Sequence, residues 1–310
     1  MKLPFALKFP AKIKTLPRFS LSRNGGAQKS SLLYCAKRRF IFHYYFMPLR
    51  SGGMEIIMKI EKIGVQLWTV RDTMNTPEEV AETFKKLKDL GYDQVQTAGC
   101  KIDYATFGKL AEDAGIEIVG THDNFDMMRD DFEQALANHK ALNTKIMGIG
   151  GHVSETEEAA VEFAKTANEI GKKAKAAGMG RFTYHNHHHE FIKFESGKRT
   201  IDILFENLDP EFASFCLDTH WVQRGGGDVR YWIEKLKGRI DILHLKDFAL
   251  DAEKTPMFAE IGNGNLYWEG IIDAAIKSGV KYYVVEQDTC PGDPFDSLKM
   301  SSEYLHKNFM

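Results

Sequence analysis

The feature that most constrains the fold is a repeated alternation of short apolar runs with amphipathic segments, from residue 62 to the end of the chain. The apolar runs are expected to be buried strands, at 62–70, 92–98, 116–122, 144–151, 181–187, 213–219, 240–247 and 281–288. A predicted helix follows each strand, at 77–90, 103–114, 131–142, 156–177, 200–208, 228–237, 268–278 and 295–308. Alternation of this kind forms parallel βαβ units. Eight units within about 250 residues predict the α/β class and a closed (β/α)8 barrel, the TIM barrel.

An open, doubly wound sheet is the alternative architecture. Such a sheet is expected to carry a G-x-G-x-x-G turn after its first strand, where glycines let a helix terminus approach a pyrophosphate. The segment VQLWTVRD, at 65–72, contains no glycine at that place. The barrel is therefore the preferred fold.

The first 54 residues differ from the rest of the chain in charge. They contain 11 lysines and arginines, no aspartate or glutamate, and prolines at positions 4, 10, 17 and 48. We interpret residues 1–57 as a basic, disordered N-terminal extension, or as sequence translated upstream of a true start at Met54 or Met58. A transit peptide is the alternative. Residues 58–310 are predicted to form one TIM-barrel catalytic domain.

Charge and cysteine content limit the classes of partner. Residues 55–310 hold 30 basic and 43 acidic residues, a net charge of −13, so no nucleic-acid partner is expected. The segment RRFIFHYYFMPL is too short and too charged to span a bilayer, so no membrane partner is expected. The four cysteines lie far apart and form no C-x-x-C pair, which favours a reducing compartment and predicts a cytoplasmic protein. The expected partners are a small sugar or cyclitol substrate and, in a homo-oligomer, further copies of the chain.

Polar side chains of unlike chemistry crowd the carboxyl ends of the predicted strands, the face at which TIM barrels hold their active sites. The first four strands contribute candidate substrate-binding residues, namely Gln66, Trp68, His122 and His152. The last four contribute His185, Asn186, His187 and Glu190, then Asp218, His220 and Trp221, then His244, Lys246 and Asp247, and finally Glu286 and Asp288. His220 and Trp221 are also assigned to substrate binding. Convergence of several histidines and carboxylates on one face indicates a functional site.

Mixed imidazole and carboxylate ligands suit Mn²⁺, Mg²⁺, Co²⁺ or Zn²⁺. A metal held in this way can chelate a carbonyl and an adjacent hydroxyl, and it stabilises the enediolate formed when the α-proton is removed. A neighbouring carboxylate can move the proton, first as a general base and then as a general acid. Lys246 or a neutral histidine can stabilise the developing oxyanion.

Five segments in the second half of the chain carry a family resemblance: RFTYHNHHHEF, CLDTHW, DILHLKDF, EIGNGNLYWEGI and YYVVEQD. In this order they resemble the sugar phosphate isomerase/epimerase superfamily, which has a xylose-isomerase-like TIM barrel, and within it the branch with the motif Y-H-N-H-x-x-E. The resemblance covers roughly residues 60–308. It implies a divalent metal bound by one residue from each of strands five to eight, the last three being Asp218, His244 and Glu286.

Strand five departs from the family pattern, because the family's Glu-Asn reads His185-Asn186 here. The resemblance leaves His185 and Glu190 as alternatives for the fourth ligand, with Glu190 preferred. In the family's epimerases, glutamates on strands five and eight form a two-base pair, so this replacement bears on mechanism. The resulting expectations assign catalysis to Glu190, Glu286, His187 and Lys246, and metal binding to Glu190, Asp218, His244, Glu286 and His185.

These expectations describe a metal-dependent sugar isomerase or epimerase that removes a proton next to a carbonyl. A keto-sugar or inosose-type lyase, a dehydratase, shares this first step and then loses a β-hydroxyl. An endonuclease IV-like phosphodiesterase would need more histidine ligands and a basic face, and a non-catalytic sugar-binding barrel would survive loss of the metal. The last two classes are less favoured.

Overall fold

The computed structural model describes residues 45–48, 54–57 and 59–310, the first two ranges by their backbone alone. Those two ranges form a short antiparallel pair, β1 (Tyr45–Pro48) with β2 (Met54–Ile57). The rest of the extension predicted at 1–57 lies outside the described residues.

Eight parallel strands form one sheet that is nearly closed into a barrel. They are β3 (Gly64–Gln66), β4 (Gln94–Ala98), β5 (Glu117–His122), β6 (Gly148–Ile149), β7 (Phe182–His185), β8 (Ala213–Asp218), β9 (Ile240–Leu245) and β12 (Tyr282–Val285). Their order in the sheet is β5-β4-β3-β12-β9-β8-β7-β6. The edges β5 and β6 meet where the Asp123 N–H donates to the Gly148 carbonyl at 2.9 Å. The predicted TIM barrel is confirmed.

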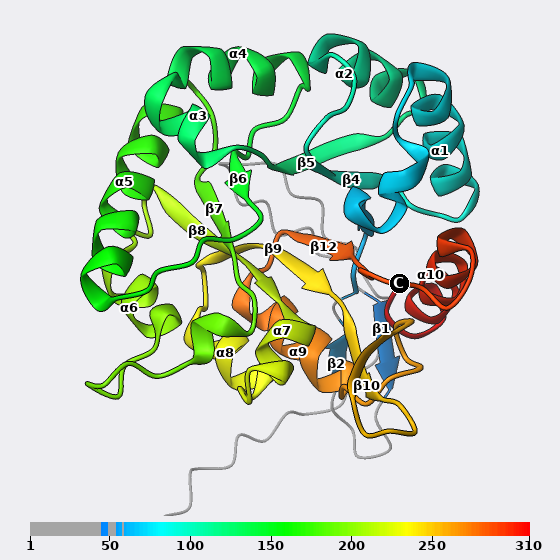
Figure 1. The fold of residues 1–310 in the computed structure, drawn as a ribbon. Helices are drawn as coiled ribbons and strands as arrows, with labels where there is room; N and C mark the ends of the chain where they lie inside the picture. The colour runs from blue at the N-terminus through cyan, green and yellow to red at the C-terminus, as the bar shows by residue number, and fades with distance from the viewer. Residues whose placement is uncertain (1–44, 49–53, 58) are drawn as a thin grey trace, which may run out of the picture. The chain divides into compact units, whose positions relative to one another are not determined.

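Helices surround the strands (Figure 1). The eight that were predicted are α1 (Pro77–Asp89), α2 (Tyr104–Asp113), α4 (Phe132–Ala141), α5 (Glu157–Ala176), α6 (Thr200–Asn207), α8 (Val229–Lys235), α9 (Trp268–Ser278) and α10 (Pro294–Phe309). Local chemistry sets their ends: the Thr76 hydroxyl caps α1 by accepting the Glu79 N–H, and Gly279 ends α9 with a φ of 78°. Across the described part of the chain, none of the helices has the length and apolar character needed to cross a bilayer.

Short elements that were not predicted follow several strands. They are η1 (Leu67–Thr73), α3 (Phe125–Asp130), η2 (His189–Phe191), α7 (Thr219–Arg224) and the hairpin of β10 (Asp247–Leu250) with β11 (Pro256–Ala259). The strand predicted at 62–70 therefore ends at Gln66, because the Gln66 side chain accepts the Trp68 N–H and starts the 3-10 helix η1. These short helices and the hairpin lie at the carboxyl ends of the strands.

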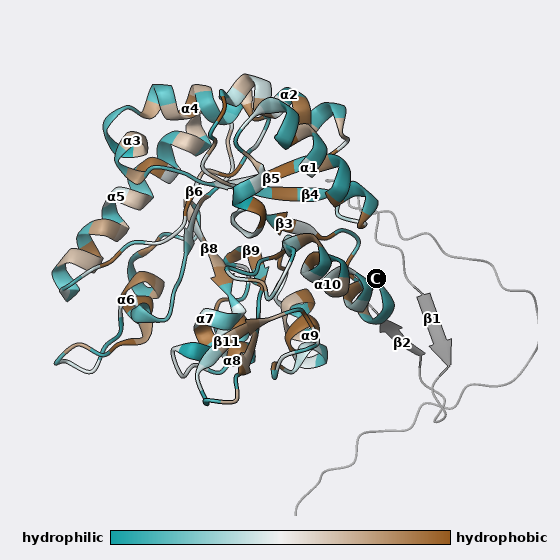
Figure 2. Cartoon of the chain, turned by 45° about the vertical axis from the view of Figure 1, so that its right-hand side comes forward, coloured by the Kyte–Doolittle hydropathy of each residue, from teal (hydrophilic) through white to brown (hydrophobic). Residues whose placement is uncertain are grey.

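Two apolar layers hold the barrel together. The larger packs the outer faces of the strands against the helices, and the smaller fills the barrel interior with Val119, Ile146, Cys216, Ile242 and Val284. Figure 2 shows hydrophilic and hydrophobic residues side by side on the surrounding helices, as expected for elements with one buried face. The packed interior supports the polar residues above it.

A buried ion-pair network lies at the amino ends of the strands, opposite the polar end. Asp241, 1% exposed, accepts from the Arg181 guanidinium at 2.6 and 2.9 Å and from the Ser214 hydroxyl at 2.7 Å. The Lys281 ammonium lies 2.7 Å from the same carboxylate. Burial alone would raise the pKa of Asp241, but Arg181 and Lys281 hold it below its usual value. This network joins β7, β8 and β9 at the end of the barrel away from the candidate site.

Candidate metal centre and active site

A cavity of about 370 Å³ opens at the carboxyl ends of the strands. Its lining residues come from almost every strand end: Trp68, Ala98, His122, Asp123, Gly150, His185, His187, Lys246, Glu286 and Asp288. Six of these were predicted as site residues from the sequence. The volume suits a small polar molecule.

Four buried side chains converge at the floor of this cavity: His185, Asp218, His244 and Glu286. One potential ligand atom from each lies within 4.8 Å of the others. Glu286 Oε2 is 3.0 Å from His244 Nδ1, and Asp218 Oδ2 is 3.4 Å from His185 Nε2. Two imidazoles and two carboxylates at this spacing match the donor set of a divalent metal.

Gln96 on β4 sets the tautomer of His244. Its Oε1 lies 2.5 Å from His244 Nε2, and an amide oxygen can only accept, so this nitrogen carries the hydrogen. His244 Nδ1 is then left with a lone pair, and it is buried without a hydrogen-bond partner in the described structure. When the ring is neutral, His244 Nδ1 and Glu286 Oε2 are therefore two acceptor atoms only 3.0 Å apart. Such a contact is stabilised when a cation lies between the two atoms.

In His185, too, one ring nitrogen donates a hydrogen bond and the other is left as an acceptor. Its Nδ1 lies 3.0 Å from the carbonyl oxygen of Gly150 and donates to it, which leaves the lone pair of Nε2 directed toward Asp218. Asp218 is held in turn, because its N–H donates to Asn186 Oδ1 and its Oδ1 caps α7 by accepting the Trp221 N–H. In metal sites, ligand histidines usually donate their second nitrogen to a carbonyl or carboxylate in this way. Both histidines are therefore oriented as ligands.

The charges in the cluster also favour a cation. Burial alone would raise the pKa of Glu286, but Lys246 and His244 lower it well below its usual value, and the pKa of Asp218 is also lowered well below its usual value. Burial favours neutral His244, yet Cys216, Glu286 and Asp218 raise the pKa of the imidazole well above normal. A site that attracts a proton to His244 attracts a metal ion for the same electrostatic reason.

Lys246 comes directly after β9, two residues beyond His244, and both side chains approach Glu286. Its Nζ is 3.1 Å from Glu286 Oε2 and 2.6 Å from Asp288 Oδ1, and it lies 4.9 Å from the centre of the Trp221 ring. The flanking carboxylates outweigh burial and raise the pKa of Lys246, so the side chain remains an ammonium. This places a fixed positive charge in the cavity wall.

Asp288 lies at the end of the eighth predicted strand, and the sequence alone indicates no specific role for it. It lines the cavity with its side chain 23% exposed. Burial raises the pKa of Asp288, against the opposing effect of Lys246. A cavity-facing carboxylate with a raised pKa has the properties of a general base.

Gln66 joins the network below the cavity. Its Nε2 donates to Gln96 Oε1 and to His122 Nδ1, both at 3.1 Å. The second His122 nitrogen, Nε2, then carries a hydrogen, and it is buried without a partner in the described residues. Burial lowers the pKa of His122 well below normal, so the ring, which lines the cavity, is neutral.

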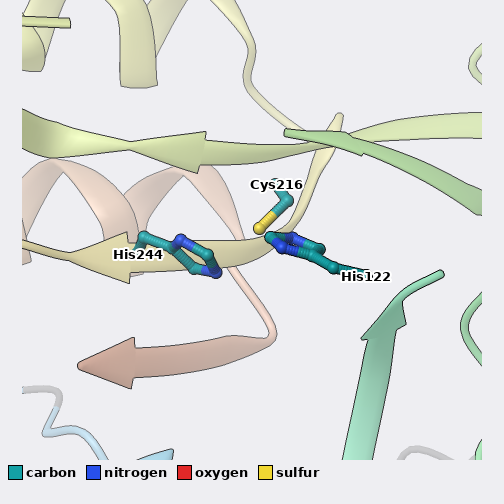
Figure 3. A group of neighbouring side chains, drawn as sticks. All are labelled: His122, Cys216 and His244. Atoms are coloured by element: carbon teal, nitrogen blue, oxygen red, sulfur yellow. The ribbon is translucent and has the colours of Figure 1, made fainter. Parts of the chain in front are cut away.

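Figure 3 shows the Cys216 sulfur between the rings of His122 and His244. These three side chains also lie close enough together to hold an ion. Gln96 competes for this position, because its Oε1 engages His244 Nε2 and its Nε2 donates to Cys216 Sγ at 3.8 Å. The amide therefore occupies the space that such an ion would need.

Glu190 lies outside the four-residue cluster, although the resemblance made it the preferred fourth ligand. Its carboxylate is fully buried below the turn after β7, where Oε1 accepts from the Tyr184 hydroxyl at 2.7 Å and Oε2 from the His187 N–H at 2.9 Å. These bonds hold it away from the cavity floor. Of the two residues that the sequence left as alternatives, His185 is the one that belongs to the four-residue cluster.

The other predicted residues lie at varying distances from the cavity. Trp68 and His187 line it, and burial lowers the pKa of His187 to about 3. His220 is buried behind it, with Nδ1 donating to the Asp247 carbonyl and its ring stacked on Phe258. His152 stacks on Phe163 and does not line the cavity.

Asp247 organises the loop beside the site. Its buried carboxylate accepts four backbone N–H groups and one indole N–H, from Phe248, Gly262, Gly264, Leu266 and Trp268. The loop needs a glycine here, since a Cβ at Gly264 would lie 2.3 Å from Asp247 Oδ1. The Gly-Asn-Gly segment thus surrounds the chain's own carboxylate.

Comparison with known proteins supports the family that the sequence motifs resemble. Residues 84–306 match the model of the xylose isomerase-like TIM barrel family. An inosose dehydratase of Mesomycoplasma hyopneumoniae (strain 7448) is 28% identical over 161 residues, which cover 46% of this chain and 52% of that protein. The chain thus matches about half the length of this curated relative.

Solved structures share the fold. A sugar phosphate isomerase/epimerase from Parabacteroides distasonis ATCC 8503 has a TM-score of 0.70 at 22% identity, over 80% of this chain and 94% of that one. A xylose isomerase-like TIM barrel protein from Mycobacterium smegmatis, in complex with magnesium, has a TM-score of 0.60 at 14% identity, over 79% and 95% of the two chains. With the family model covering most of the barrel, the chain belongs to the xylose isomerase-like TIM barrel family.

Proposed function

We propose that His185, Asp218, His244 and Glu286 bind one divalent metal ion, and that the protein uses it to remove a proton next to the carbonyl of a sugar or cyclitol. The observation that carries this proposal is the buried Nδ1 of His244, which has no hydrogen-bond partner in the described structure and lies 3.0 Å from Glu286 Oε2, in a ring oriented by Gln96. A mixed nitrogen and oxygen donor set suits Mn²⁺, Mg²⁺, Co²⁺ or Zn²⁺. When bound, such an ion polarises a carbonyl and an adjacent hydroxyl.

The residues around the cavity have complementary roles in this reaction. Asp288, with its raised pKa, accepts the α-proton, while Glu286 remains ionised as a ligand. Lys246, at 2.6 Å from Asp288, stabilises negative charge that develops on the substrate oxygen. The His122 Nε2–H orients a substrate hydroxyl, and Trp68 forms an apolar wall against the ring.

Isomerisation is the first candidate outcome, because one base that moves a proton between neighbouring carbons is sufficient for it. A two-base epimerisation through carboxylates of strands five and eight has less support, since Glu190 is bound to Tyr184 and His187 rather than directed into the cavity. His185 occupies the corresponding place in the ligand cluster.

Dehydration of a keto-sugar or inosose is the second candidate. It shares the proton removal and then expels a β-hydroxyl, which an acid beside the base can protonate. The similarity to proteins named inosose dehydratase favours it. The two outcomes differ in product and not in the first step.

Metal binding is tested by equilibrium dialysis of the full chain against Mn²⁺ after chelator treatment. Asp218→Asn and Glu286→Gln are expected to lose the ion bound at this cluster. Asp241→Asn is the matched control, because it removes a buried carboxylate of the same barrel far from the cavity. Unchanged Mn²⁺ binding at this cluster in both site variants would refute the ligand assignment.

Proton removal is tested by incubating the metal-loaded protein with keto-sugars and inososes in D₂O. Deuterium is expected at the α-carbon of recovered or converted substrate. Product analysis then separates an isomer from a dehydrated ketone. Conversion without any solvent deuterium in substrate or product would contradict a proton exchanging with solvent through Asp288.

A further inference from the structure

A second group of potential ligands follows β7, in the turn that contains three consecutive histidines. His187, His189 and Glu190 each offer one atom to a common region, and these atoms lie within 4.8 Å of one another. The rings of His187 and His189 are nearly parallel, at 14° with 5.5 Å between their centres. We call these three residues the histidine turn. None of them belongs to the four-residue cluster on the cavity floor.

The carboxylate of the histidine turn is buried without a cationic partner. Glu190 is fully buried, and among the described residues no lysine or arginine lies within ion-pair distance of it. Its two hydrogen bonds, from the Tyr184 hydroxyl and the His187 N–H, hold the group in place but do not neutralise its charge. Buried charges in proteins are normally paired or bind a metal.

The two imidazoles present unpartnered nitrogens to the same region. His189 Nε2 lies 3.4 Å from Glu190 Oε1, but the two atoms do not form a hydrogen bond. His187 Nδ1 is also buried without a partner in the described structure. Space beside this nitrogen is kept free by Gly151, since a Cβ there would lie 2.8 Å from it. Buried polar atoms without partners are rare, and two in one turn call for a ligand.

We propose that His187, His189 and Glu190 bind a second divalent metal ion of the Zn²⁺ or Co²⁺ type, for which two imidazoles and one carboxylate are suitable donors. Three protein ligands leave a coordination position open. Of the three ligands, His187 lines the cavity, so the second ion would lie beside the substrate space. The second ion depends on side chains separate from the first, so either ion can be present without the other.

The test is a count of metal equivalents bound by the full chain. After chelator treatment, the protein is titrated with Co²⁺ and bound metal is measured by equilibrium dialysis. We expect two equivalents for the unchanged protein, one for His189→Phe, one for Asp218→Asn and none for the double variant. His188→Ala is the matched control, because His188 stacks on Trp221 outside the histidine turn, and it is expected to bind two.

Several outcomes separate the two ions. A single equivalent that is lost in Asp218→Asn and kept in His189→Phe would overturn the second ion alone. A single equivalent with the opposite dependence would support the histidine turn and refute the four-residue cluster. Two equivalents retained in His189→Phe would also overturn the proposal.

A second measurement does not depend on how a variant folds. In protein labelled with ¹⁵N-histidine, saturating Zn²⁺ is expected to shift the resonances of His187 Nδ1 and His189 Nε2. If a proton shared between His189 and Glu190 occupied the site instead, these resonances would move with pH and stay unchanged on adding Zn²⁺. That result would overturn the proposal.

Discussion

Gln96 Oε1 accepts the hydrogen of His244 Nε2 at 2.5 Å, and this one bond leaves the lone pair of Nδ1 facing Glu286. The glutamine is itself oriented, because Gln66 donates to the same oxygen and Cys216 accepts from its nitrogen. A residue on β4 thus determines which nitrogen a histidine on β9 can offer to a metal.

Replacing Gln96 by leucine is expected to weaken metal binding by about 10- to 100-fold, the usual effect of removing a group that orients a metal ligand. The measurement is the Kd for Mn²⁺ at the four-residue cluster. Gln94→Leu is the control, because Gln94 is a buried glutamine of the same strand that donates to Glu117 instead. Equal loss of affinity in both variants would attribute the effect to general loosening of β4.

Replacing Lys246 by methionine is expected to lower kcat about 100-fold, the loss typical of removing one group that stabilises an oxyanion. Metal should still bind, because the ligand set is intact. The measurements are deuterium exchange into substrate and Mn²⁺ stoichiometry. Lys281→Met, at the amino end of the barrel, is the control for loss of a lysine, and a full loss of metal in Lys246→Met would contradict the assigned role.

Asp241 provides a pH-dependent contribution to stability. Its pKa is lower in the folded protein than in the unfolded chain, so its contribution is present above about pH 4 and is lost as the pH falls through the folded value. Removing one partner of a buried ion pair costs roughly 3 kcal/mol or more. Urea denaturation of Asp241→Asn and the unchanged protein should therefore differ by about that amount at pH 7 and by clearly less near pH 3. A difference that stays constant between these pH values would contradict this account.

A chain that begins at Met58 is expected to fold and to bind metal like the full chain. The barrel is fastened near its start by the Ile60 N–H, which donates to the Phe309 carbonyl at 3.0 Å, and by the buried side chains of Ile60 and Ile63. The measurement is the thermal midpoint of both forms. A decrease of more than about 2 °C, roughly 1 kcal/mol for a domain of this size, would show that residues 1–57 contribute to the stability of the barrel.

The barrel could be predicted from the sequence because buried parallel strands and amphipathic helices have different periods, and their alternation extends over the whole domain. The positions of Asp218, His244 and Glu286 could be predicted because each lies at or next to the carboxyl end of an apolar strand. Short elements such as α7 and the β10–β11 hairpin could not, since six or four residues carry too little periodicity.

Two features of the site could not be predicted from the sequence, because they depend on how the chain folds. Gln96 has no distinguishing neighbours in the sequence, and its role depends on strands β4 and β9 meeting across the barrel interior. The direction of Glu190 depends on the 3-10 turn η2, which aims its carboxylate at Tyr184 instead of toward His185. The sequence alone leaves both His185 and Glu190 as possible fourth ligands, because either residue type can bind a metal at this strand end. Only the geometry of the turn separates the two.

The carboxylate of Asp247 has a consequence for binding. It supplies the anion around which residues 262–266 fold, so this loop becomes ordered during folding and does not wait for a ligand. Its conformational entropy is therefore not subtracted from the free energy of substrate association. Lys246, the preceding residue, is held by the same rigid segment, and its ammonium is in position before any substrate arrives.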